Sequence, residues 1–226
     1  MTDPLYRLLA WLSPAYPIGA FSYSHGVETA VEEGLVRDRD TLVAWLDSVL
    51  RLGTGAVDGA LFAAAWRAAE AADWATFDGV AERAAAWRGT SEMALESRQQ
   101  GGSFLSITRT AWPHPALDAA HERLGGELSL AVAVALAAAA HGIALATALE
   151  GYLHAFAANL ISAAVRAVPL GQSDGQRALA ALEPAVRATR DAALAVASLD
   201  EVGTATPLLD WCSLRHETQY TRLFRS

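Results

Sequence analysis

The stretch that decides the fold is residues 128–149, LSLAVAVALAAAAHGIALATAL, the most hydrophobic segment of this 226-residue chain. Its length is close to what a membrane-spanning helix needs. His141 and Gly142 interrupt it, however, and ten of its 22 positions are alanine, which gains little from lipid. A helix that is apolar on every side is typical of one surrounded by other helices. The segment therefore predicts a buried central helix, not a membrane span.

Helical signals also fill the rest of the chain. Leu42, Leu46 and Leu50 recur at helical spacing, and Asp3 and Asp40 are candidate N-caps. No window alternates β-branched residues between turns. We therefore expect a single compact all-α domain over residues 1–226. The expected helices span residues 4–12, 22–33, 40–53, 58–72, 73–88, 91–108, a short segment ending near 125, 128–149, 151–168 and 176–198, with Pro184 as a kink in the last.

Charge and composition exclude several classes of function. All 17 basic residues are arginine, so the chain has no Schiff-base lysine and no P-loop lysine. The net charge of −8 argues against nucleic-acid and anionic-membrane partners. A single cysteine, Cys212, excludes an intrachain disulfide. The N-terminus lacks a signal peptide's basic and apolar regions, so we expect a cytoplasmic protein.

The sequence offers only weak candidates for metal binding and catalysis. Cys212 and His216 are four residues apart, so on a helix both would face the same way and offer transient metal ligands. Two ligands do not close a site, and we expect neither a resident metal nor a cofactor. One alternative is an all-helical enzyme that pairs His25 with Ser22, Tyr23 or Ser24. Another is a small-ligand-binding protein that uses the same loop.

Two segments are unusual for purely structural roles. Residues 13–28, SPAYPIGAFSYSHGVE, combine prolines, glycines and aromatic residues in a stiff loop that leads into a helix, which suits a recognition surface. The C-terminus alternates apolar and arginine side chains where chain ends are usually polar, which suggests docking onto a partner. The sequence thus predicts partner-binding residues at both ends of the chain: Tyr23, Ser24, His25, Glu28, Tyr220, Arg222, Leu223, Phe224 and Arg225.

These residues fall in motifs that resemble the UreF family of urease accessory proteins. Residues 13–29, 159–177 (NLISAAVRAVPLGQSDGQR) and 215–226 (RHETQYTRLFRS) are similar to that family's N-terminal, central and closing motifs, in the same order. Residues 96–103 only approximate the family pattern, and 114–126 lack its histidine, aromatic and proline pattern. The resemblance covers nearly the whole chain.

The resemblance implies a non-enzymatic, all-helical maturation factor that forms a homodimer. It implies binding to the accessory protein UreD (also called UreH) and recruitment of the GTPase UreG to the urease apoprotein, where nickel is inserted. Modulation of that GTPase is a further implied role. On this interpretation, residues 208–226 form a partner-docking segment.

Overall fold

The structure is a computed structural model of the chain, and it describes residues 4–226. Asp3, the expected cap of the first helix, lies outside the described residues. Within residues 4–226 every regular element is a helix, as predicted. The elements are α1 (Pro4–Trp11), η1 (Ala20–Ser22), α2 (Val27–Glu32), α3 (Arg39–Leu52), α4 (Thr54–Glu70), α5 (Trp74–Ala86), α6 (Ser91–Ala111), α7 (Pro115–Leu124), α8 (Leu130–Ala140), α9 (Leu145–Ala167), α10 (Gln172–Ala181), α11 (Glu183–Ala195), η2 (Leu199–Glu201) and α12 (Pro207–His216).

The predicted central helix is confirmed as α8, which is buried almost along its whole length and packs against α4, α6, α7 and α9. Its extent differs from the prediction, because the apolar stretch forms two helices. Gly142 adopts a left-handed conformation at φ +68°, which stops α8, and α9 begins at Leu145. Among residues 4–226, no helix has the length and hydropathy needed to cross a membrane.

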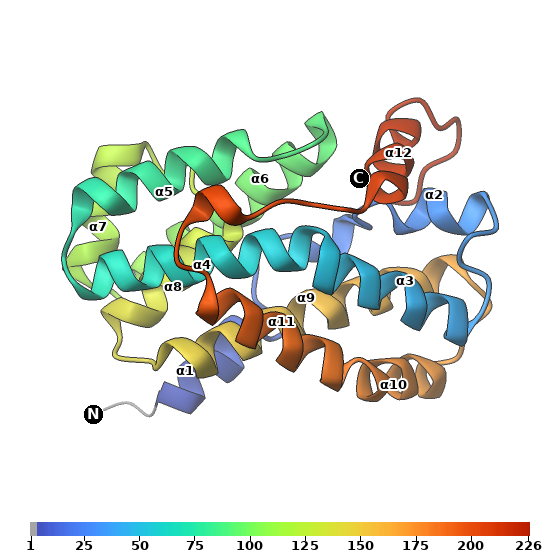
Figure 1. Cartoon of the computed structure of the whole chain (residues 1–226), viewed down its shortest axis with the longest axis horizontal. Helices are drawn as coiled ribbons and strands as arrows, with labels where there is room; N and C mark the ends of the chain where they lie inside the picture. Colours follow the sequence, from blue (N-terminus) through green and yellow to red (C-terminus); the bar gives the residue numbers. More distant parts are fainter. Residues whose placement is uncertain (1–3) are drawn as a thin grey trace.

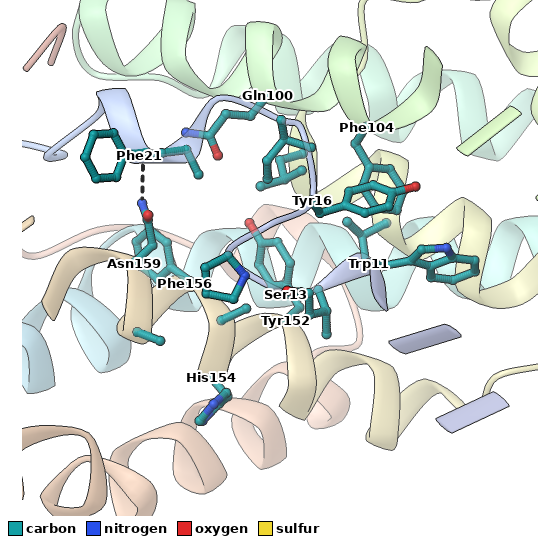
Figure 2. Close-up of a pocket in the computed structure, with 18 of the residues that line it drawn as sticks. Trp11, Ser13, Tyr16, Phe21, Gln100, Phe104, Tyr152, His154, Phe156 and Asn159 are labelled. Carbon is teal, nitrogen blue, oxygen red and sulfur yellow. Dashed lines mark hydrogen bonds between the residues drawn. The ribbon is translucent and has the colours of Figure 1, made fainter. Parts of the chain in front are cut away.

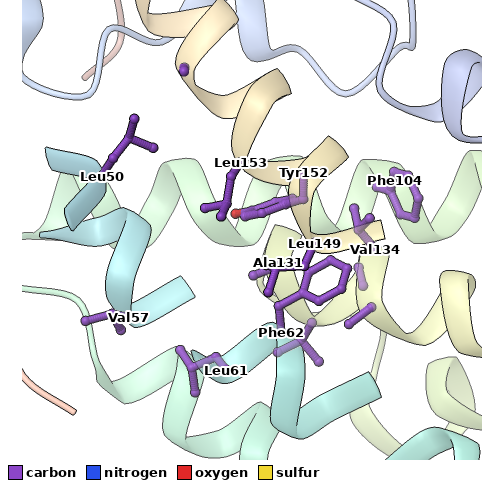
Figure 3. Packing of buried hydrophobic residues seen from close by; sticks show 14 of the residues in the cluster. Leu50, Val57, Leu61, Phe62, Phe104, Ala131, Val134, Leu149, Tyr152 and Leu153 are labelled. Carbon is purple, nitrogen blue, oxygen red and sulfur yellow. The ribbon is translucent and has the colours of Figure 1, made fainter. Parts of the chain in front are cut away.

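The largest part of the core lies where α4, α6, α8 and α9 meet (Figure 3). Phe62 of α4 and Tyr152 of α9 are in ring contact, with centroids 5.5 Å apart, while Phe104 closes the side formed by α6. Small residues bring the helices close together: a Cβ on Gly101 of α6 would lie only 2.0 Å from the carbonyl oxygen of Leu128. The alanine-rich sequence therefore produces tight packing between helices.

Three helices begin at other residues than predicted, because the residues at their N-termini have other roles than expected. Asp38, not Asp40, caps α3: its carboxylate accepts from the N–H of Thr41, and the Thr41 hydroxyl accepts from the Asp38 N–H. The helix α4 begins at Thr54, four residues before the expected start. Pro184 lies in the first turn of a separate helix, α11, instead of kinking a long one.

The first and the last helix lie at different places on the molecule. Figure 1 shows α1 near one end of the bundle and α12 beside α2 near the other. The segment 22–33 is not one helix, because Gly26, at φ +78°, separates η1 from α2. This break turns α2 toward α12, against which it packs. The fold thereby brings the N-terminal motif and the C-terminal segment together.

Candidate functional site

The two segments singled out in the sequence form one structural unit. The backbone N–H of Arg225 donates to the carbonyl of Ser22 at 2.8 Å, and the N–H of Ser24 donates to the carbonyl of Ser226 at 2.9 Å. We call the contact between residues 22–28, residues 216–226 and the first two turns of α6 the tail junction. Its main-chain bonds join positions about two hundred residues apart in sequence.

Glu28 is the carboxylate that holds the tail. It lies in the first turn of α2, is 7% exposed, and accepts the backbone N–H groups of Leu223 at 2.7 Å and Phe224 at 3.1 Å. Its Oε2 atom also lies 3.0 Å from Nε2 of His216. A buried carboxylate is costly unless such donors replace its lost water. Glu28 is thus satisfied only while the tail is in place.

His216 links Glu28 to a second buried carboxylate. The imidazole is fully buried, with its Nδ1 atom 2.7 Å from Oε2 of Glu92 on α6. Each ring nitrogen of His216 thus lies within hydrogen-bond distance of one carboxylate oxygen, and the imidazole links α2 to α6. Arg222 completes this part of the junction by donating from Nη1 to Oε1 of Glu92 at 3.0 Å.

His25 connects the junction to α4. It has a left-handed backbone at φ +54°, which is uncommon for a residue other than glycine. Its Nδ1 atom lies 3.2 Å from Oε2 of Glu96, and its Nε2 atom lies 2.8 Å from Oγ1 of Thr54. Oε2 of Glu96 also accepts the hydroxyl of Ser226 at 2.7 Å.

Glu96 is an ionised carboxylate inside the protein. Burial raises its pKa, but the neighbouring His25, the hydroxyl of Ser226 and Arg88 lower it, and the net result is a pKa below the usual value. Ionised Glu96 can therefore only accept hydrogen bonds, which assigns the hydrogen on Nδ1 of His25 to the bond with Glu96.

The hydroxyl partner of His25 differs from the three that the enzyme alternative considered. Among the described residues it is Thr54, while Tyr23 donates to Gln99 of α6 and Ser24 to the carbonyl of Ser226. The backbone is left-handed at both His25 and Gly26, which turns the chain directly after Tyr23 and Ser24. The combination of His25 with Ser22, Tyr23 or Ser24 is thus not assembled.

The predicted partner-binding residues divide into a buried and an exposed set. Tyr220 is fully exposed and Leu223 is 68% exposed, although the backbone of Leu223 is bonded to Glu28. Phe224 points inward, where its ring lies on the guanidinium of Arg166, 4.4 Å away. The buried set is Tyr23, Ser24, His25, Glu28 and Phe224, and the exposed set is Tyr220, Arg222, Leu223 and Arg225.

Exposed apolar residues continue from the tail onto α12. Leu208, Trp211 and Leu214 follow one another at a spacing of three residues, and each is 40% or more exposed. Together with Tyr220 and Leu223 they form what we call the α12–tail surface. A group of large apolar side chains in this arrangement is typical of a protein-binding surface.

The two candidate metal ligands are both buried on the inner face of α12. Burial, with a smaller contribution from Glu33, raises the pKa of the Cys212 thiol to about 11. Both ring nitrogens of His216 are already hydrogen bonded to carboxylates. In the part of the chain that the structure describes, no group of three or more His, Cys, Asp or Glu side chains is arranged to hold a metal ion.

A cavity of about 250 Å³ lies beneath the N-terminal loop and borders the junction (Figure 2). Its walls are mainly aromatic and aliphatic, with Tyr16 and Phe104 in ring contact on one side and Phe156 on the other. Glu96 and Gln100 supply polar groups at the α6 side. The cavity and the junction thus share the carboxylate of Glu96.

Sequence reasoning missed several residues on which the junction depends. Glu96 begins the segment 96–103, which only approximates the family pattern, and Arg166 lies in the motif 159–177 without an assigned role. Glu92 and Thr54 carry no local signal. Their long-range partners lie 29 to 145 residues away in sequence. Glutamates one turn apart on a partly apolar helix are the one available hint, because such spacing places both on the same face.

Comparison with known proteins gives consistent matches. The UreF family model matches residues 36–183. The urease accessory protein UreF of Granulibacter bethesdensis is 53% identical over 222 residues, covering 98% of this chain and 94% of that protein. The proteins of the same name from Rhodopseudomonas palustris strain HaA2 and Bradyrhizobium diazoefficiens are 54% and 50% identical, again over 98% of this chain and over 93% and 91% of their own lengths.

Proposed function

The chain belongs to the UreF family of urease accessory proteins, and from this premise we propose that it is a non-catalytic adaptor in urease maturation. In this role it binds UreD (UreH) and recruits the GTPase UreG to the urease apoprotein, where nickel is inserted. The proposal includes a cytoplasmic location and a homodimeric state, with nickel as cargo and no resident cofactor.

The observation that carries the proposal is that the backbone of the C-terminal segment is held by the protein while some of its side chains are exposed. Glu28 fixes the tail backbone at Leu223 and Phe224, while the side chains of Tyr220 and Leu223 face outward. A loose tail would lose conformational entropy on binding, whereas a tail already held in place loses much less. The arrangement therefore favours the α12–tail surface as a preorganised docking site for UreD.

The chemistry of this surface indicates the complementary partner face. Trp211 and Tyr220 can enter apolar pockets, and aromatic anchors of this kind dominate many interfaces. Arg222 and Arg225 are exposed in the same C-terminal segment, in a chain whose net charge is −8. A partner face with apolar pockets surrounded by carboxylates would match both properties.

Co-purification of the full chain with UreD and UreG, with and without GTP and nickel, tests the proposal. Removal of residues 218–226 should abolish binding to UreD and, as a result, recruitment of UreG. That truncation also removes buried Phe224 and Ser226, so circular dichroism must show that the helices persist. A folded truncation that binds UreD with unchanged affinity would contradict the proposal.

A double substitution separates docking from folding more cleanly. Tyr220→Ala with Leu223→Ala removes exposed side chains and leaves the backbone bonds to Glu28 in place. We expect about 2 kcal/mol or more of lost affinity per hot-spot residue, with unchanged thermal stability. Leu52→Ala is the matched control, because Leu52 is 52% exposed at the end of α3, outside the α12–tail surface. Equal affinities for the double variant and the control would exclude this surface.

A further inference from the structure

The cavity beneath the N-terminal loop contrasts with the close packing of the helices around it. At Gly101 of α6 an added Cβ would lie only 2.0 Å from the carbonyl oxygen of Leu128. Interiors packed in this way contain few voids larger than a water molecule. The cavity volume of about 250 Å³ exceeds the roughly 150 Å³ of an engineered protein cavity that binds benzene. There is thus room for a molecule of one or two aromatic rings.

Aromatic rings line two sides of this cavity. Tyr16 and Phe104, whose ring centroids are 5.5 Å apart, lie on one side, and Phe156 lies on the other (Figure 2). Leu130 and Val134 of α8 add aliphatic surface. Planar aromatic molecules pack favourably against aromatic side chains, beyond the gain from burial alone. The walls therefore favour a planar ring as the occupant.

The cavity has an exposed end and a buried end. Phe21 of the N-terminal loop and His154 of α9 both line it and are exposed, so it reaches the surface between these two segments. Glu96 and Gln100 of α6 line it as well, but they are only 6% and 5% exposed. Figure 2 shows Gln100 and His154 on opposite sides of the cavity. A molecule that enters from solvent can therefore place a polar group against α6.

The polar group that α6 offers to such a molecule is the carbonyl oxygen of Gln100. Nε2 of Gln100 lies 3.3 Å from Oε1 of Glu96, and the ionised carboxylate can only accept, so this contact fixes which way the amide is turned. Within residues 4–226 the carbonyl oxygen of Gln100 has no hydrogen-bond partner. A buried acceptor without a donor is costly. A ligand with an N–H or O–H group would supply that donor.

The charges around Glu96 favour a neutral ligand over a cation. His25, with Nδ1 at 3.2 Å from Oε2 of Glu96, and Arg88 both lower the pKa of this carboxyl group through charge interactions. The negative charge of Glu96 is therefore already balanced within the protein. An ammonium group placed beside it would be an additional buried charge without a counterion of its own, which is unfavourable.

We propose that this cavity binds a neutral, planar aromatic molecule of one or two rings that carries an N–H or O–H donor, as an indole or a phenol does. The ring lies between Phe156 and the pair formed by Tyr16 and Phe104, and the donor bonds to the carbonyl oxygen of Gln100. The site is separate from the α12–tail surface, and the adaptor role does not depend on it.

Calorimetric titration of the full chain with three related probes tests the proposal. Indole has the donor, benzofuran has the same ring shape with an oxygen in place of the N–H group, and tryptamine adds an ammonium group. We expect one indole per chain, at least tenfold weaker binding of benzofuran, and weaker binding of tryptamine than of indole. Absence of saturable indole binding, equal affinities for indole and benzofuran, or tighter binding of tryptamine would overturn the proposal.

A cavity-filling substitution locates the bound ring. Ala155 lines the cavity on the same face of α9 as Tyr152 and Asn159. Ala155→Leu should weaken indole binding at least tenfold, because the larger side chain occupies the space. Ala146→Leu is the matched control, at an exposed position of α9 outside the lining residues. Equal indole affinities for these two variants, each shown by circular dichroism to be folded, would refute the assignment to this cavity.

A second substitution tests the donor contact. Gln100→Met keeps a side chain of similar length and removes the carbonyl oxygen. This variant should bind indole and benzofuran equally, because neither then finds an acceptor at that position. A preference for indole that persists in Gln100→Met would contradict the role given to Gln100.

Discussion

The core around α8 and the tail junction are both buried, but they are stabilised in opposite ways. The core is built from apolar side chains; α8 itself contributes only alanine, valine and leucine. The junction buries Glu28, Glu92, Glu96, His25 and His216 within a few turns of one another. Apolar burial is non-directional, so removing one contact leaves the others intact. In a buried polar network each group depends on a particular partner, so one substitution leaves another group unsatisfied.

The largest effect is expected in the core, at the contact between α6 and α8. Gly101→Ala places a Cβ 2.0 Å from the carbonyl oxygen of Leu128, and backbone cannot move aside as a flexible side chain can. We expect a loss of about 4 kcal/mol in the free energy of unfolding, measured by urea denaturation.

Gly79→Ala is the control for this change. Gly79 is exposed in α5, with nothing within 4 Å of an added Cβ. Alanine has the higher helix propensity, so the control should gain up to about 1 kcal/mol. Equal stability of the two variants would show that α6 and α8 are not so closely packed.

The next largest loss of stability is expected at a buried ion pair within the core. Arg88 pairs with Asp58 at 2.7 Å, both side chains are almost fully buried, and Asp58 also accepts the hydroxyl of Tyr152 at 2.8 Å. Arg88→Met leaves a buried carboxylate without its cation and should cost about 3 kcal/mol in thermal or urea unfolding. Arg51→Met breaks the partly exposed pair with Asp47 and should change stability by less than about 1 kcal/mol.

In the junction, Glu28→Gln should loosen the tail without unfolding the core. The amide cannot accept from two backbone N–H groups and also balance His216 as a carboxylate does, so we expect a local cost of about 2 kcal/mol. Hydrogen exchange at Leu223 and Phe224 should speed up, while exchange in α8 stays slow. Glu32→Gln, at an exposed position on the same helix, is the control. Uniform acceleration over the whole chain would show that junction and core unfold together.

The smallest expected effect is the response of the junction to acid. Glu96 has a pKa below its usual value of 4.5, so its ionised form stabilises the fold at any pH above that value. This stabilisation disappears as pH falls through the lowered pKa. Tail protection in hydrogen exchange should therefore decline below about pH 4.5, and Glu96→Gln should flatten the decline. An unchanged decline in the variant would assign the acid response to other groups.

The contrast also explains what could be predicted from the sequence. Periodicity of apolar residues identified most helices, and the all-round hydrophobicity of residues 130–140 correctly predicted a buried centre. Apolar periodicity and hydrophobicity are both properties of a short stretch of sequence, so they can be read without knowledge of the fold. The predicted helix over residues 128–149 does not include the break between α8 and α9, because hydropathy does not report that Gly142 takes the left-handed conformation that ends helices.

The chemistry of the junction could not be predicted in this way. Both end segments were recognised as unusual, but nothing in the sequence places Glu28 beneath the N–H groups of Leu223 and Phe224. The same holds for His25, whose hydroxyl partner was sought among its neighbours and lies on α4. Hydrogen bonds between distant segments are fixed by helix packing, which periodicity alone does not specify.

The position of the tail in the sequence has a consequence for synthesis. The ribosome synthesises residues 222–226 after all the helices of residues 4–216. The hydrogen-bond donors that Leu223 and Ser226 give to Glu28 and Glu96 are therefore added last. The helical bundle can form on the nascent chain, whereas the tail junction can close only after these residues have left the exit tunnel. Until then the buried carboxylates are open to water and to chaperones. The tail junction therefore forms only after the helices of residues 4–216 have been synthesised.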